Sequence, residues 1–146
     1  MRLPLRATED YKGAGKTLYD FPSLVRWIVA IRYPDGVTAE EGDAWYRDVH
    51  APELAGQEKL VRLFSSRALP GSAFHRVTEL WYEDMAGWYD SVVRRPLSYT
   101  RPPWAAAEAK DIPDFFRSYH ELIGMFLPEH PECDFLQELG PYTVTS

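Results

Sequence analysis

Residues 24–41, LVRWIVAIRYPDGVTAEE, contain the pattern that decides the fold. Residues 24–33 are rich in β-branched and aromatic side chains, so they predict a β-strand, which a Pro-Asp-Gly turn brings to an end. Thr38, followed three residues later by Glu41, has the form of a capping box and predicts a helix over residues 39–49. The regular structure is therefore expected to open with a strand and a helix.

The segments that follow extend this order. Residues 60–69 and 75–82 predict two antiparallel strands joined by a Pro-Gly-Ser turn. Asp84 is expected to cap a second helix that ends near Arg95, and residues 119–127 predict a last strand. Strand, helix, two strands, helix, strand is a split βαβ pattern. We expect an α+β, ferredoxin-like fold, with a four-stranded antiparallel sheet and helices on one face.

The whole chain, residues 1–146, is expected to form one domain, because domains commonly span about 100–200 residues. Residues 1–22 mix charges with Gly and Pro and predict an N-terminal arm, and residues 128–146 predict a C-terminal tail. The net charge of −6 disfavours nucleic acids and anionic membranes as partners. A single cysteine and the lack of a long apolar segment favour a soluble, cytoplasmic protein.

Apolar side chains occupy both faces of the predicted strand at residues 24–33. One face carries Val, Trp, Ile and Tyr side chains, whereas the other carries three aliphatic side chains together with Arg26 and Arg32. A sheet with a half-apolar second face is not expected to lie open to water. We therefore predict that a second copy of the chain covers this face and that the protein is a homodimer.

Residues 45–54, WYRDVHAPEL, resemble the signature of the EthD-like family, which is part of the dimeric α+β barrel superfamily. Residues 79–84, ELWYED, are similar to the segment in which a strand of that family leads into its second helix. The resemblance covers residues 24–127 in element order. It implies a barrel-shaped dimer with a cavity between sheet and helices. Related proteins use this cavity for cofactor-free isomerisation, lactone rearrangement, dehydration or cyclisation of small oxygenated metabolites.

His50 is the first candidate catalytic residue. It follows Tyr46 by four residues, so the imidazole and the phenol are predicted to share one helical face and one pocket. Because Pro52 disfavours helical geometry at the residue before it, His50 is expected near the carboxyl end of the helix. His50 could act as a general acid or base, with Tyr46 donating a hydrogen bond to an enolate oxygen. Alternatively, His50 only caps the terminal carbonyl groups of its helix.

Arg26 and Arg32 are candidates for binding a substrate carboxylate, since each guanidinium offers a planar fork of donors. This role requires that the face bearing them lines the cavity. The alternative is that these arginines form an ion pair with Glu79 or lie exposed to solvent.

His75, Glu79 and Trp81 alternate along the predicted third strand and so are expected on one face, where His75 and Glu79 could transfer protons as a pair. His120, on the predicted last strand, is a further candidate for substrate binding. The alternative for each histidine is a partly buried structural side chain.

No motif predicts a cofactor or a metal. Residues 13–17, GAGKT, lack the earlier glycine and the preceding strand of a phosphate loop. Residues 130–133, HPEC, lack a second pair of metal ligands.

These candidates together predict a cofactor-free isomerase that moves protons on a small, unsaturated, carboxylated metabolite from aromatic-ring catabolism. A lyase or dehydratase could use the same residues, because abstraction of a proton next to a carbonyl also begins elimination. A third hypothesis is a non-catalytic accessory protein that binds such a metabolite.

Overall fold

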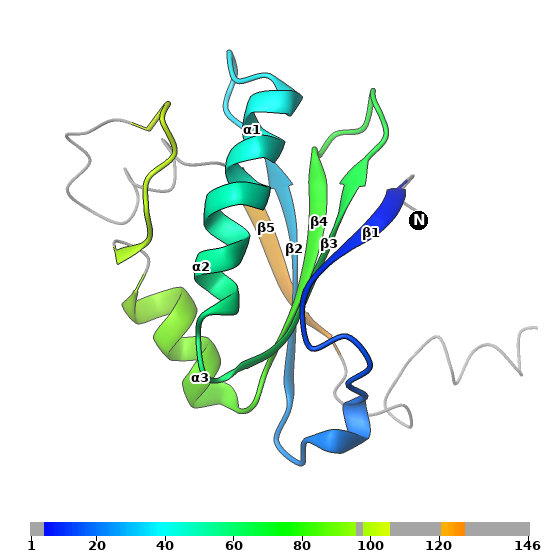
Figure 1. Cartoon of the computed structure of the whole chain (residues 1–146), viewed down its shortest axis with the longest axis vertical. Helices are drawn as coiled ribbons and strands as arrows, with labels where there is room; N and C mark the ends of the chain where they lie inside the picture. Colours follow the sequence, from blue (N-terminus) through cyan, green and yellow to red (C-terminus); the bar gives the residue numbers. More distant parts are fainter. Residues whose placement is uncertain (1–4, 96–97, 106–120, 128–146) are drawn as a thin grey trace, which may run out of the picture.

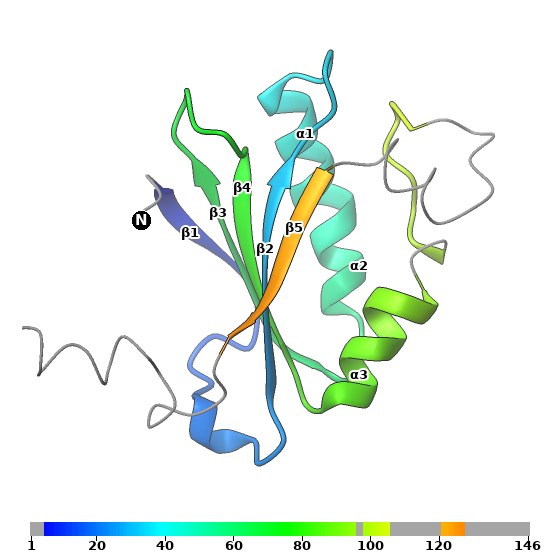
Figure 2. The same ribbon diagram turned by 180° about the vertical axis from the view of Figure 1, so that it is seen from behind.

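The computed structural model describes residues 5–95, 98–105 and 121–127. Five strands form one antiparallel sheet, and the helices lie on one side of it (Figures 1 and 2). The strands are β1 (Leu5–Lys12), β2 (Val25–Arg32), β3 (Leu60–Ala68), β4 (Arg76–Tyr82) and β5 (Glu121–Leu127). The helices are α1 (Ala39–Trp45), α2 (Ala51–Ala55) and α3 (Met85–Tyr89), with π-helical turns at Tyr46–His50 and Asp90–Arg94 and a short 3₁₀ helix at Leu18–Asp20.

The sheet has the order β1-β3-β4-β2-β5. The four predicted strands correspond to β2, β3, β4 and β5, and their ends differ from the prediction by at most about two residues. Both predicted helix starts also occur, since Glu41 donates its backbone N–H to Thr38 Oγ1 at 3.2 Å and Gly87 donates to Asp84 Oδ1 at 2.8 Å. The prediction of an α+β fold with an antiparallel sheet is confirmed.

The prediction of an irregular N-terminal arm is wrong for residues 5–12, which form β1 and pair with the outer edge of β3. Glu9 of this strand lies opposite Ser65, and Asp10 lies opposite Phe64. The sequence of β1, LRATEDYK, is charged and lacks apolar alternation, which is common in edge strands. For this reason the arm showed no strand pattern.

The predicted end of the first helix is also wrong, because the chain stays helical through Pro52 as far as Ala55. Ala51 donates its backbone N–H to the carbonyl of Tyr46, five residues earlier, which is the bond of a π turn. Pro52 has no N–H group to donate, and it directly follows this π turn, at the start of α2. His50 therefore lies inside a continuous helix and does not cap its carboxyl end.

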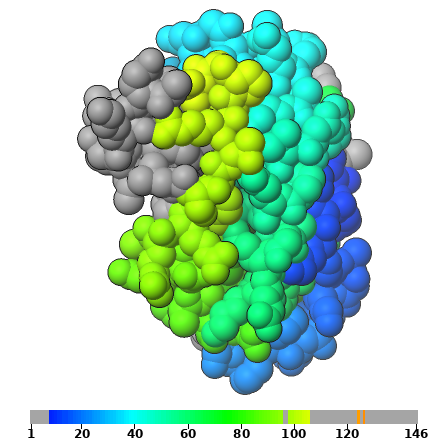
Figure 3. Space-filling view, turned by 60° about the vertical axis from the view of Figure 1, so that its left-hand side comes forward, coloured from blue at the N-terminus to red at the C-terminus, as the bar shows by residue number. Residues whose placement is uncertain are grey.

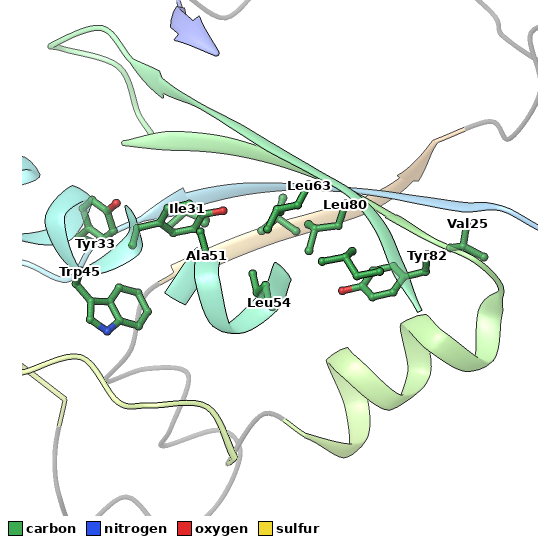
Figure 4. Close-up of a cluster of buried hydrophobic side chains, with 12 residues drawn as sticks. Val25, Ile31, Tyr33, Trp45, Ala51, Leu54, Leu63, Leu80 and Tyr82 are labelled. Carbon is green, nitrogen blue, oxygen red and sulfur yellow. The ribbon is translucent and has the colours of Figure 1, made fainter. Parts of the chain in front are cut away.

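The core lies between the helices and the sheet (Figure 4). Val25, Ile31, Leu63, Leu80 and Tyr82 point from the sheet toward Trp45, Ala51 and Leu54 of the helical layer, and all are buried. A second aromatic cluster joins Trp27 to Trp88 and Phe126, with ring centroids 5.4 and 4.7 Å from Trp27. Gly124 interrupts the pattern of β5 for a steric reason, since a Cβ there would lie 2.1 Å from Trp27 Cζ2.

Candidate functional site

His50 lies in the π-helical turn and is buried among aromatic rings. Its imidazole stacks on Trp45 with centroids 4.9 Å apart, and the ring of Tyr99 approaches it edge-on at 5.7 Å. Burial lowers the pKa of His50 from its ordinary value of 6.5 to about 3, because the imidazolium would lose its hydration. His50 is therefore a neutral imidazole at physiological pH.

Tyr46 lies next to His50, as the spacing of four residues predicts, with ring centroids 5.6 Å apart. Its hydroxyl is hydrogen-bonded to Thr78 Oγ1 at 2.7 Å, and the guanidinium of Arg76 lies 4.1 Å from its ring centroid. Burial raises the pKa of the Tyr46 phenol. Tyr46 and His50 are thus brought together, but the Tyr46 hydroxyl is hydrogen-bonded to Thr78 of the sheet.

Residues 98–105 lie against the helical layer (Figure 3), and Tyr99 of this segment borders His50. The hydroxyl of Tyr99 donates to the carbonyl of Ser91 at 3.1 Å and accepts a hydrogen bond from Gln57 Nε2. Thr100 donates its backbone N–H to Glu53 Oε2 at 3.0 Å. These bonds fasten the segment to α2 and to the π turn after α3, so Tyr99 forms a wall of the His50 environment.

Arg26 lies on the opposite face of the sheet from His50, because it alternates with the core residues of β2. Its Nη2 forms an ion pair with Glu79 Oε1 at 2.8 Å, and its guanidinium lies 5.8 Å from the ring centroid of Trp81. This is the ion pair that was the alternative for Arg26. The structure therefore brings Arg26, Glu79 and Trp81 together, but separates them from His50 by the sheet.

Arg32 is exposed at the end of β2, on the same face as Arg26 by strand alternation. It too lies across the sheet from His50. His120, the remaining candidate, lies outside the residues that the structure describes.

His75 does not form the predicted pair with Glu79. It precedes β4 and stacks on Tyr33, with ring centroids 4.8 Å apart and an interplanar angle of 25°. The backbone N–H of Tyr33 donates to His75 Nδ1 at 3.0 Å. His75 precedes the regular strand, so its side chain does not follow the alternation of β4. The carboxylate of Glu79 is bonded to Arg26 instead.

A groove of about 500 Å³ lies between α1 and the turn that joins β3 to β4. One wall comes from the first turns of the helix, and the other from the end of β3, the turn and His75. Its lining side chains include Glu40, Asp43, Arg47, Arg67, Phe74 and His75. His50 and Tyr46 are not among the lining residues, so the groove is distinct from their environment.

A buried polar network behind the groove was missed by sequence reasoning. The Arg76 side chain is fully buried and bonds to Asp43 Oδ1 at 3.0 Å, Glu9 Oε1 at 3.0 Å and Ser65 Oγ at 2.8 Å. Tyr33 donates its hydroxyl to the same Asp43 oxygen at 2.8 Å. A signal was present, since Arg76 has the parity of Leu80 and Tyr82 on β4 and therefore belongs to the core face.

Within the described ranges, no three His, Cys, Asp or Glu side chains gather in a way that would hold a metal ion. The helices of those ranges are also too short or too polar to span a membrane. No family model matches the chain, and no curated protein is detectably similar to it.

Proposed function

We propose that the protein is a cofactor-independent isomerase that moves a proton on a small, unsaturated acid from aromatic-ring catabolism, with His50 as the proton-transferring group. The observation that carries the proposal is the neutral imidazole of His50, held in a π-helical turn among aromatic rings. Single π turns inside helices are frequent at functional sites. A neutral imidazole can accept a proton, whereas an imidazolium cannot. Because the lowered pKa makes His50 a weak base, the bound anionic substrate has to stabilise the imidazolium while the proton is transferred.

The aromatic surroundings favour a flat, conjugated substrate. Trp45 and Tyr99 border the imidazole, and residues 98–105, which include Tyr99, lie against the helical layer (Figure 3). Aromatic rings bind conjugated molecules through their faces and edges. The sequence resemblance of residues 45–54 to the EthD-like family points to the same class of chemistry.

In the proposed reaction, His50 removes a proton from the carbon next to a carbonyl group and returns it to a different carbon. The double bond moves, and no electrons are gained or lost overall. General acid–base catalysis of this kind contributes about 10²–10⁴-fold to a rate. In this scheme Tyr46 packs beside the imidazole. It does not donate a hydrogen bond to the substrate, because its hydroxyl is already bonded to Thr78.

We also propose that the finer fold is ferredoxin-like and that the protein is a homodimer. The order β3-β4-β2-β5, all antiparallel with helices on one side, supports the first point. Ile28 and Ala30 of β2 support the second, because these apolar side chains lie on the sheet face away from the helices and are only half-buried. A second copy could cover this face. Cytoplasmic localisation stays a prediction from the sequence.

The test is proton NMR of muconate and its lactones with the enzyme in deuterated water. We expect isomerisation with deuterium incorporated at a substrate carbon, because the abstracted proton exchanges on the imidazole. His50→Phe is the diagnostic variant, since it keeps a ring to stack on Trp45 and removes the nitrogen atoms. His75→Asn is the matched control, because its amide oxygen can still accept from the Tyr33 N–H.

The proposal requires that H50F folds and loses turnover about 10²-fold or more, while H75N keeps it. Elimination of water in place of isomerisation would identify the protein as a lyase with the same base. Binding without turnover in the unmodified protein would favour the accessory, metabolite-binding function. Turnover unchanged in H50F would remove His50 from the mechanism.

A further inference from the structure

The groove between α1 and the β3–β4 turn has charged groups of both signs on its walls. Glu40 and Asp43 of α1 and Arg47 of the π-helical turn that follows it are spaced three and four residues apart, so they lie on one helical face. On the opposite wall, Arg67 and His75 flank the turn. The two carboxylates and two guanidiniums balance in charge.

Asp43 is the most rigidly held of these groups. Arg76 Nε, Arg76 Nη2 and the Tyr33 hydroxyl all donate to its Oδ1. The side chain is 12 % exposed and lines the groove, which leaves Oδ2 as the oxygen that a ligand can reach. Because the Arg76 side chain that holds it is fully buried, the Asp43 carboxylate is preorganised. Little conformational entropy of this side chain is therefore lost when a ligand binds.

His75 lines the groove, and one of its ring nitrogens is already bonded to the backbone. Its Nδ1 accepts the backbone N–H of Tyr33, so the neutral ring carries its hydrogen on Nε2. This arrangement suits recognition of an acceptor more than abstraction of a proton. The groove is therefore better fitted for binding than for the chemistry proposed at His50.

Arg67 has donors to spare. Its contact with Glu9 Oε2 is a single one through Nε at 3.5 Å, and its terminal nitrogens make no hydrogen bond to any residue in the described ranges. Arg47 is similar, with a single contact from Nε to Asp48 Oδ1 at 3.1 Å. Both guanidiniums can still offer their terminal N–H groups to a carboxylate.

We propose that this groove binds a small dipolar organic acid, which carries a carboxylate and an ammonium group on an apolar body. The carboxylate binds Arg67 and the Nε2–H of His75, and the ammonium group binds Asp43 Oδ2 with help from Glu40. The apolar body lies against Leu69 and Phe74 of the turn. A zwitterion also avoids the long-range repulsion that the net charge of −6 exerts on a simple anion.

This inference does not depend on the proposed reaction. The groove residues and His50 are different sets, so either proposal can fail while the other stands. A volume of about 500 Å³ lies within the usual range of small-molecule sites, about 300–1,000 Å³.

The test uses ligands that differ only in their charged ends. The ¹H–¹⁵N NMR spectrum of the full chain is titrated with 4-aminobutyrate, butyrate and butylamine, and with the corresponding six-carbon series. We expect shifts of the amides of residues 39–47 and 67–75. In at least one series, we expect the amino acid to bind about tenfold more tightly than the acid or the amine, since each missing end loses a charge-assisted hydrogen bond.

Two variants assign the ends of the ligand. Arg67→Gln should weaken the amino acid about tenfold and leave the amine unchanged, whereas Glu40→Gln should weaken the amino acid about threefold and leave the acid unchanged. Arg94→Gln and Glu58→Gln are the charge-matched controls, because both residues are exposed and lie outside the groove. Thermal melts establish that each variant folds.

Three results would overturn the proposal. Equal affinity for the amino acid and the acid would show that Asp43 and Glu40 do not bind the ammonium group. Absence of shifts at the groove amides with both series would show that the groove binds no such ligand. An equal loss of affinity for the amino acid in the control variants would show that the ligand responds only to the general surface charge of the protein.

Discussion

Glu9 on β1 and Arg76 on β4 form an ion pair with a distance of 3.0 Å, although β3 lies between their strands. The guanidinium is fully buried, and the carboxylate also accepts the Tyr11 hydroxyl at 2.6 Å. Burial alone would raise the pKa of Glu9, but its hydrogen bonds with Tyr11 and Arg76 and the charge of Arg76 hold it below the ordinary value. The edge strand is thus attached to the core through a buried charge.

Replacement of Arg76 by Met should destabilise the protein strongly. The substitution leaves the carboxylate of Asp43 buried without its cation, and breaking a buried pair in this way costs about 3–5 kcal/mol. The free energy of unfolding from urea denaturation measures the effect. Arg94→Met, at an exposed arginine, is the control and should cost less than about 0.5 kcal/mol. A loss below about 1 kcal/mol in R76M would contradict the network.

Stability should fall as the pH decreases below the ordinary pKa of histidine. The pKa of His50 is 6.5 in the unfolded chain and about 3 in the folded protein, so between these values the unfolded state binds the extra proton. The contribution is complete above pH 6.5 and is lost progressively toward pH 3. Between about pH 7.5 and pH 5 the expected loss is about 2 kcal/mol.

Urea denaturation at these two pH values checks this expectation, with His50→Phe as the reference. The variant has no group to titrate at this position, so its loss of stability over the same interval should be smaller by about 2 kcal/mol. The same pH dependence in both proteins would assign the effect to other groups.

Replacement of Gly42 by Ala should destabilise the junction between α1 and Tyr33. A Cβ at this position would lie 2.2 Å from Tyr33 Cδ2, and the ring is fixed by its hydrogen bond to Asp43 and its stack with His75. Overpacking of this kind costs about 1–3 kcal/mol. Gly56→Ala is the control, because its nearest neighbour would lie at 3.4 Å. Equal melting temperatures for the two variants would contradict the rigid placement of Tyr33.

Much of the fold was accessible from the sequence, because the relevant signals are local. The β-branched run of β2, the capping box at Thr38 and the Asp84 cap each specify an element within a few residues. The strand β1 was not predicted, since the pairing of a charged edge strand depends on a partner far away in the sequence. The continuation of the helix past Pro52 was not predicted, because a π turn arises from packing and has no simple sequence pattern.

The candidate site was less accessible. The proximity of Tyr46 and His50 follows from helical periodicity and was predicted. Alternation placed Arg26 and Glu79 on one face, and the ion pair was foreseen as the alternative to substrate binding. The groove and the Asp43–Arg76 pair join residues far apart in the chain, which periodicity within one element cannot reveal.

The most direct test of the account is the titration of the four histidines by ¹⁵N NMR of the imidazole nitrogens, with His50 assigned through H50F. We expect His50 to stay neutral as the pH is lowered to about 5, because burial among Trp45 and Tyr99 disfavours the imidazolium. Protonation of His50 with a midpoint near 6.5 in the folded protein would contradict it, since the imidazole would then be hydrated and not enclosed.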